Sequence, residues 1–139
     1  MAVSVAAQQT ITVGDPVVIE AASDSGSVAV VFEDDGETGY FYSVDVSNDE
    51  LRILDAMHIY TVVDVSDREL PSTIKVLWDD GGTRAALLVN DYPHAVFDFG
   101  ERRGYCRTDY PEPPAGSDWV RPEWNDLVLE SFDLAAGHA

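Results

Sequence analysis

The residues of greatest chemical interest lie in the stretch NDYPHAVFDF, residues 90–99, which places one histidine and two aspartates among large apolar side chains. A histidine beside a carboxylate is the usual pair for general acid–base catalysis. If HAVFDF is a strand, however, His94 and Asp98 lie two pleats apart, at about 13 Å by the rise of a β-strand. The two side chains therefore do not hydrogen-bond within one strand unless a bulge intervenes, and His94 needs a carboxylate from a neighbouring strand.

An acid–base pair would have to form between strands. Its candidates are the histidines and aspartates of the apolar segments, His58, His94, Asp55 and Asp98. For His58, in LDAMHIY, the alternative is a half-buried histidine that is held by hydrogen bonds and has no catalytic role. The chain has no G-x-S-x-G, P-loop or G-x-G-x-x-G pattern, so hydrolase, NTPase and dinucleotide-binding functions lack support.

Metal and cofactor sites are not expected. The three histidines, His58, His94 and His138, lack the spacing of metal ligands, and Cys106 is the one cysteine. A single cysteine forms no internal disulfide, which fits a reducing compartment. The first residues lack the basic and apolar regions of a secretory signal, and no apolar run approaches the ~18 residues that span a bilayer. We therefore expect a cytoplasmic protein without a metal or cofactor.

One basic patch, GERRGYCR, covers residues 100–107. Arginines this close together are suited to bind a carboxylate or phosphate through paired hydrogen bonds. The alternative is that they pair with aspartates of the same chain. The candidate binding residues are these arginines and their aromatic neighbours, Tyr92, His94, Arg102, Arg103, Tyr105 and Arg107.

The chain is strongly acidic, since 26 acidic residues against eight basic ones give a formal net charge of −18. Such a surface repels the phosphates of nucleic acids and anionic lipids, so neither a nucleic acid nor a membrane is an expected partner. It attracts a basic protein. The same composition also arises without a partner, as a solubility device in a salt-adapted or high-GC organism, and the acids are scattered along the chain.

Alternation of apolar and polar residues predicts strands along most of the chain. In YFYSVDV, residues 40–46, Tyr40 and Tyr42 fall on one face, and Phe41 falls on the other. LRILDAMHIYTVVDV, residues 51–65, is predicted as a long strand with a helical turn near SNDE at its start. The other predicted strands are 15–22, 27–34, 73–78, 83–89, 94–99 and 105–111.

The two halves of the strand-rich region follow one plan. Each places an aromatic residue, Phe32 or Trp78, before an acidic hairpin turn, DDGETG or DDGG. Each then places an aspartate, Asp55 or Asp98, at the end of a later apolar pair. This order predicts a mainly β fold of two successive antiparallel meanders that form a sandwich or half-open barrel, because a propeller needs more blades.

The C-terminal part has a different pattern. PEPPAGSD, residues 111–118, is a Pro-rich connector whose prolines cannot donate to a sheet. Beyond it, Leu127, Val128, Ser131 and Leu134 fall at helical spacing, which predicts one helix over residues 122–136 that covers an open sheet face. We expect a single domain over residues 1–139, with a β core at 28–112 and the connector and helix at 113–139.

Several strings carry a resemblance to a known family. DDGETGYFYSVD, ILDAMHIYTV, AALLVNDYPHAVFDF and GYCRTDYP resemble a family of small uncharacterised bacterial proteins, a domain of unknown function. The resemblance covers about residues 28–112 and implies no activity. It draws attention to the motif residues His58, Tyr92, His94, Cys106 and Arg107, which would serve either a site or the packing of a turn and a sheet.

Three functions remain open from the sequence. The first is a protein-binding module, such as an immunity-type or regulatory inhibitor of a basic protein, and it predicts an exposed apolar or aromatic patch without a deep pocket. The second is a small enzyme, which predicts a pocket where His58 and His94 meet a carboxylate. The third is an anion binder, which predicts that Arg102, Arg103 or Arg107 points into a cleft without a carboxylate partner.

Overall fold

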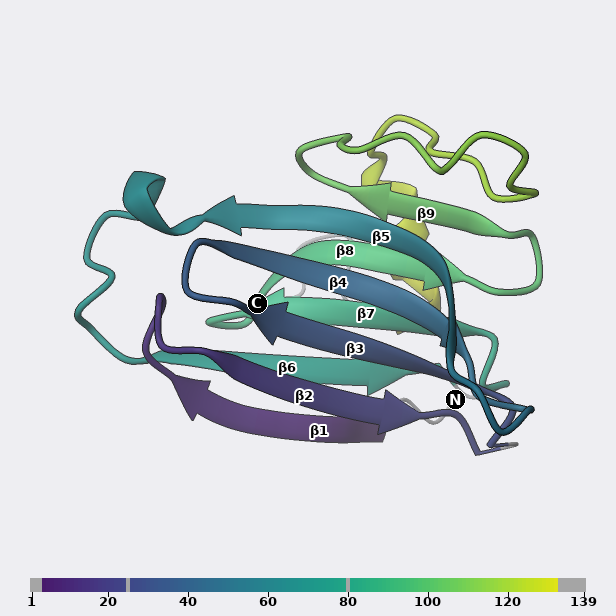
Figure 1. Ribbon diagram of the computed structural model, residues 1–139, viewed down its shortest axis with the longest axis horizontal. Coiled ribbons are helices and arrows are strands. Elements are labelled where there is room, and N and C mark those ends of the chain that lie inside the picture. The colour runs from purple at the N-terminus through teal and green to yellow at the C-terminus, as the bar shows by residue number, and fades with distance from the viewer. Residues whose placement is uncertain (1–3, 25, 80, 133–139) are drawn as a thin grey trace.

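The computed structural model describes residues 4–24, 26–79 and 81–132, and these residues form nine β-strands (Figure 1). The prediction of a mainly β chain is confirmed. Two 3₁₀-helices, η1 Val62–Asp64 and η2 Asp126–Phe132, complete the described elements. The strands are β1 Ser4–Ile11, β2 Val17–Ala22, β3 Val28–Asp34, β4 Thr38–Asp45, β5 Arg52–Thr61, β6 Ser72–Trp78, β7 Arg84–Val89, β8 Tyr92–Asp98 and β9 Arg103–Cys106.

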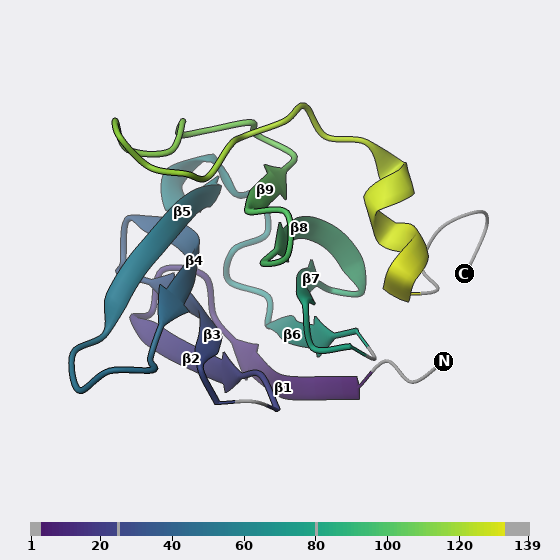
Figure 2. The same ribbon diagram turned by 90° about the vertical axis from the view of Figure 1, so that its right-hand side faces the viewer.

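The strands form two antiparallel sheets that face each other (Figure 2). β2, β3, β4 and β5 are consecutive neighbours in the four-stranded sheet. β6, β7, β8 and β9 are consecutive neighbours in the five-stranded sheet, where β1 adds an edge beside β6. The two successive meanders are thus confirmed, and because the sheets are not closed into a barrel, the arrangement is a two-layer sandwich.

Two local features differ from the sequence-based expectation. The helical turn near β5 follows the strand as η1 instead of preceding it, and residues 47–50 form bends. Strand β1 was not expected, because SVAAQQTI lacks a regular alternation of apolar and polar residues. Its pairing with β6 creates it, with a bulge between Val5 and Ala7, so tertiary context overrides a weak local preference.

The main core lies between the sheets. Phe41 of β4 stacks on Phe97 of β8, with ring centroids 5.2 Å apart. The predicted division of β8 holds, because Ala95 and Phe97 belong to this core while Val96 faces the other way. The buried residues of the main core include Val30, Phe32, Phe41, Met57, Ile74, Val76, Leu87 and Phe97.

A second, smaller core lies on the outer face of the five-stranded sheet. There η2 contributes Leu129 and Phe132, which pack against Leu77, Leu88 and Val96. The predicted α-helix over 122–136 is wrong within the described residues, where a 3₁₀-helix spans Asp126–Phe132. A 3₁₀-helix has three residues per turn, so residues three apart share a face, and Leu129 and Phe132 are therefore the buried pair.

The predicted apolar stripe of that helix differs accordingly. Leu127 is 63% exposed, and Val128 is partly buried against the second core. The side chains of Ser131 and Leu134 lie outside the described part of the chain. The expected role is still met, because the C-terminal segment covers the outer face of the five-stranded sheet. The outer face of the four-stranded sheet has no such cover from a described helix (Figure 2). Among the described residues, no helix is long and apolar enough to cross a membrane.

Candidate functional site

Asp55, a candidate for catalysis, forms an ion pair with Arg121, a residue that the sequence analysis did not single out. The carboxylate is fully buried in β5 and accepts two hydrogen bonds from Arg121, one to each oxygen at 2.7 Å. Arg121 also donates to the carbonyl oxygens of Gly104, Ala56 and Pro111, at 2.9, 3.1 and 2.9 Å. All donor groups of its guanidinium are engaged, so this ion pair fastens the C-terminal connector to β5 and β9.

Other motif residues form contacts at the same junction, where β5 of one sheet lies next to β9 of the other. The backbone N–H of His58 donates to the carbonyl of Tyr110 at 2.8 Å, and Thr108 Oγ1 donates to the carbonyl of His58 at 2.9 Å. A Cβ on Gly104 would lie 2.5 Å from Asp55 Oδ2, and closer still to Arg121. The glycine in GYCRTDYP is therefore required, because a larger residue would clash with Arg121 and Asp55. These motif residues form the junction between the two sheets.

Asp98 is likewise committed to an arginine. Its carboxylate, almost fully buried, accepts a hydrogen bond from Arg84 Nε at 2.9 Å and one from the backbone N–H of Glu101 at 3.0 Å. In the contacts of the described residues, neither His58 nor His94 bonds to Asp98 or Asp55. The arrangement that an acid–base pair requires is therefore not assembled from these four residues.

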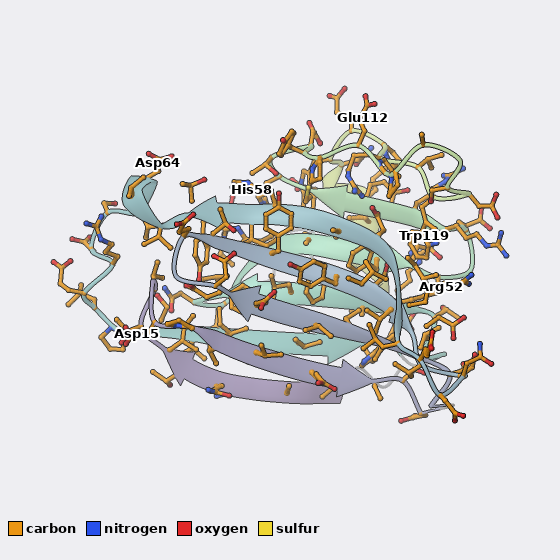
Figure 3. All side chains as sticks on the ribbon, in the orientation of Figure 1. Asp15, Arg52, His58, Asp64, Glu112 and Trp119 are labelled. Atoms are coloured by element: carbon orange, nitrogen blue, oxygen red, sulfur yellow. The ribbon has the colours of Figure 1, made fainter. Side chains whose placement is uncertain are left out.

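His58 lies on β5, an edge strand of the four-stranded sheet (Figure 3). Its Nε2 is 3.0 Å from Thr61 Oγ1, and its ring meets Tyr40 and Tyr110 edge to face. Partial burial lowers the pKa of His58, against a smaller opposing effect of Asp64. The ring is neutral at pH 7, as expected of a hydrogen-bonded, half-buried histidine.

Three of the candidate binding residues do come together. The guanidinium of Arg107 lies between the rings of Tyr92 and Trp124, with its carbon 4.4 Å from each ring centroid. Arg107 Nε donates to the carbonyl of Pro93 at 2.6 Å. His94 meets Tyr92 edge to face, and burial, with a smaller contribution from the charge of Arg107, lowers its pKa to about 4.

The other three candidates lie elsewhere. Arg102 forms an exposed ion pair with Asp118 at 2.9 Å. Arg103 bonds to Tyr105, and this hydrogen bond raises the pKa of the arginine. Arg107 itself has a carboxylate, that of Asp126, at 3.9 Å. The basic stretch GERRGYCR therefore does not converge on one anion site.

Several grooves are large enough for a small ligand, and two of them are lined by candidate residues. One, of 360 Å³, lies under the C-terminal segment and includes the Arg84–Asp98 ion pair. The other, of 590 Å³, lies at the end of the sandwich where Figure 3 labels Arg52 and Trp119. In both grooves each arginine has an aspartate partner, because Arg52 is 3.5 Å from Asp45 and Arg102 pairs with Asp118. No group of three metal-ligating side chains occurs among the described residues.

The outer face of the four-stranded sheet carries a different set of side chains. Tyr42 lies opposite Val31 and Ala56, while Tyr40 lies opposite Glu33 and His58. Directly opposed residues of a sheet share a face, and none of these side chains is buried. We call this surface the aromatic face; it comprises Val18, Glu20, Val31, Glu33, Tyr40, Tyr42, Ala56 and His58. Figure 3 shows it toward the viewer.

Charge is unevenly divided between the two halves of the chain. Residues 1–67, which include the whole four-stranded sheet, contain half of the 26 acidic residues but one basic residue, Arg52. The other seven basic residues lie in residues 68–121. In the described structure, the carboxylates of Glu20 and Glu33 form no ion pair. The aromatic face is therefore an acidic surface without a lysine or arginine of its own.

Sequence reasoning had a signal for part of this surface. The alternation in YFYSVDV placed Tyr40 and Tyr42 on one face of a strand, and the structure turns that face outward. It had no signal for Arg121, whose partner is 66 residues away in the sequence, or for the packing of Trp124 on Arg107.

Comparison with known proteins gives a family and little more. Residues 11–133 match the model of a family described as "Uncharacterized protein conserved in bacteria (DUF2251)". An uncharacterized protein of Haemophilus influenzae is 46% identical over 104 residues, which cover 75% of this chain. The aligned part spans 65% of that relative's length. No solved structure matches the chain.

Proposed function

The chain belongs to this family of uncharacterized proteins conserved in bacteria, and on that premise we propose that it is a protein-binding module whose partner is a basic protein. The observation that carries the proposal is the aromatic face. It combines two carboxylates without an ion pair, the exposed Glu20 and the partly exposed Glu33, with the rings of Tyr40 and Tyr42. Aromatic residues are enriched at the centres of protein interfaces.

The electrostatic argument favours a basic partner. A formal net charge of −18 repels other acidic surfaces and raises the rate of encounter with basic ones. The half of the chain that builds the aromatic face has almost no basic residues, so the acidic charge there is not neutralised internally. A basic surface that docks on this face would supply the missing positive charge.

A role as inhibitor or regulator follows from the same features. In the described structure His58, His94, Asp55 and Asp98 form no catalytic pair, and we infer that the sandwich acts by covering a surface of its partner. If the covered surface is the basic, substrate-binding region of an enzyme or toxin, binding inhibits that partner. We place this action in the cytoplasm, because a single buried cysteine, Cys106, suits a reducing compartment.

Two substitutions that change the net charge equally provide the test. Glu20→Lys reverses one charge on the aromatic face, and Glu112→Lys does so in the connector beyond β9 (Figure 3). Both residues are exposed. The tagged wild-type protein would be used to capture partners from lysate of its own organism, at low and at near-native salt, and a captured basic protein would then be titrated against each variant.

We expect Glu20→Lys to weaken the complex by at least about tenfold, because like charges at an interface are strongly unfavourable. Glu112→Lys should change the dissociation constant less than about threefold, because an exposed charge outside the interface contributes little. Equal effects of the two variants would mean that only the net charge matters. The absence of any stoichiometric basic partner at near-native salt would refute the proposed function.

A further inference from the structure

We propose that the partner anchors itself with an arginine whose guanidinium lies on the paired rings of Tyr40 and Tyr42 and binds the carboxylate of Glu33. This inference rests on the proposed function and names the group that the aromatic face recognises. It distinguishes a defined contact from a general attraction between an acidic and a basic surface.

The two tyrosine rings form a continuous platform. Tyr40 and Tyr42 are two residues apart on β4, so their side chains leave the same face of the sheet. Their ring centroids are 5.9 Å apart, and the ring planes differ by 22°. The rings are therefore nearly parallel neighbours, and both are partly exposed on the outer face of the sheet.

A carboxylate is fixed at the edge of this platform. The hydroxyl of Tyr42 donates to Glu33 Oε1 at 3.1 Å. The second oxygen, Oε2, accepts no hydrogen bond from any described residue, so it is open to a donor from outside. Burial, followed by the hydrogen bond to Glu33, raises the pKa of Tyr42 to about 12. The phenol therefore stays protonated at neutral pH and continues to orient the carboxylate.

The protein has no arginine of its own for this position. The one basic residue of β2–β5 is Arg52, which lies at the start of β5 and faces Asp45 at 3.5 Å. The described ion pairs of Lys75, Arg84, Arg102, Arg107 and Arg121 are all made with aspartates from residue 55 onward. The two rings and the carboxylate of Glu33 are therefore in place, and the chain supplies no cation to bind them.

Elsewhere in the molecule, two aromatic rings and a carboxylate hold an arginine of this chain, in a different geometry. Arg107 lies between Tyr92 and Trp124, with its guanidinium carbon 4.4 Å from both ring centroids, and has the carboxylate of Asp126 at 3.9 Å. The aromatic face offers two rings and a carboxylate in the same combination. What Arg107 supplies there from within the chain, a partner would supply here.

An arginine fits this site better than a lysine. The planar guanidinium stacks on aromatic rings, offers several donors to a carboxylate and is less strongly hydrated than an ammonium group. The surroundings also suit an interface centre, because Val18 is 56% exposed and Tyr110 is 60% exposed nearby, beside Glu33 and His58 respectively. Apolar neighbours of this kind exclude water from the central contact.

The test compares two synthetic peptides of equal charge, one with three arginines alternating with glycine and one with three lysines alternating with glycine. Each is titrated into the full chain, and the chemical shifts of the Tyr40 and Tyr42 ring protons are followed by NMR. We expect the arginine peptide to bind about two- to fivefold more tightly, the range given by a cation–π contact at an exposed site. The ring protons of both tyrosines should shift with it.

Two variants of one residue locate the effect. Tyr42→Leu removes the ring, and we expect the preference for the arginine peptide to disappear while lysine binding changes little. Tyr42→Phe keeps the ring and loses only the hydrogen bond to Glu33, so most of the preference should remain. The ring-proton shifts of the wild-type protein give an answer even if Tyr42→Leu folds poorly.

The possible results separate the two proposals. Equal binding of the two peptides, or a preference that survives in Tyr42→Leu, overturns the arginine anchor and leaves a basic partner in place. Binding of the arginine peptide that shifts other resonances but not those of Tyr40 and Tyr42 also overturns it. If the partner captured from lysate is not basic and neither peptide binds, the proposed function itself is refuted.

Discussion

Replacing Arg121 with methionine should lower the free energy of unfolding by about 3–5 kcal/mol, because it leaves a buried carboxylate without its partner. The side chain of Asp55 is 0% exposed and that of Arg121 is 3% exposed, so solvent does not screen this ion pair. Methionine retains the volume of the aliphatic part of arginine, so the loss reports mainly on the charge and its hydrogen bonds.

The magnitude follows from the contacts that are lost. Two bonds of 2.7 Å to the carboxylate disappear, and the carbonyls of Gly104, Ala56 and Pro111 lose their donor. Asp55 retains one hydrogen bond, from the backbone N–H of Ala56 at 2.9 Å. Charge-assisted hydrogen bonds contribute about 1.5–3 kcal/mol each, so the two bonds to the carboxylate account for the stated loss, which is also the loss expected when one partner of a buried ion pair is removed.

The assay is equilibrium unfolding in urea, followed by tryptophan fluorescence at pH 7. Arg102→Met is the matched control, because Arg102 forms a single bond of 2.9 Å to Asp118 with both side chains largely exposed. An exposed ion pair contributes about 0–1 kcal/mol, so the control should be nearly neutral. Joint replacement of Asp55 by leucine and Arg121 by methionine should recover part of the loss, because no buried charge remains.

A loss below about 1 kcal/mol for Arg121→Met, similar to that of Arg102→Met, would refute the argument that burial makes this pair important. It would mean that water reaches Asp55 and that the connector is held by other contacts. A double variant that is less stable than Arg121→Met alone would also contradict the electrostatic explanation.

Three further predictions follow from the same structure. Gly104→Ala should destabilise the fold by at least about 2 kcal/mol, because a Cβ would displace the ion pair of Arg121. Urea unfolding beside the control Gly81→Ala, whose added carbon would have its nearest neighbour, Thr83 Oγ1, at 3.8 Å, checks that the loss comes from the clash. The pKa of His94 falls from 6.5 to about 4 on folding, so the unfolded chain binds more protons between these two values. The free energy of unfolding therefore falls as the pH drops through this window, by about 2 kcal/mol at pH 5. A His94→Asn variant whose stability has the same pH dependence as that of the wild type would contradict this. The melting temperature should rise as KCl increases toward molar concentration, because salt screens the repulsion within a chain of net charge −18; a falling melting temperature in calorimetry would count against it.

The sequence by itself determined most of the strands and their order. The alternation of residues in β4 and β8, together with the acidic hairpin turns, fixed which side chains face the core, and Phe41 and Phe97 meet there as their faces require. The alternation of apolar and polar residues along a strand is a local property, because it depends only on one side of that strand being buried. The two meanders could therefore be predicted without knowledge of how the sheets pack.

The end of the chain was harder to predict for a physical reason. Leu127, Val128, Leu129 and Phe132 are compatible with either an α-helix or a 3₁₀-helix over so short a segment, and packing on the second core selects the 3₁₀ form. Strand β1 likewise exists because β6 offers it an edge. In both places the local preference is weak, and contacts with distant residues decide the structure.

The roles of the polar residues were decided by tertiary structure alone. Asp55 looked like a candidate base until its partner, 66 residues away, was located, and the three neighbouring arginines proved to have separate partners. The sequence also contained the excess of acids in its first half, but only the packing of the sheets shows that Glu33, Tyr40 and Tyr42 share one uncovered face. Charge and periodicity are properties of neighbours in sequence, whereas a site depends on residues that meet only when the two sheets are in place.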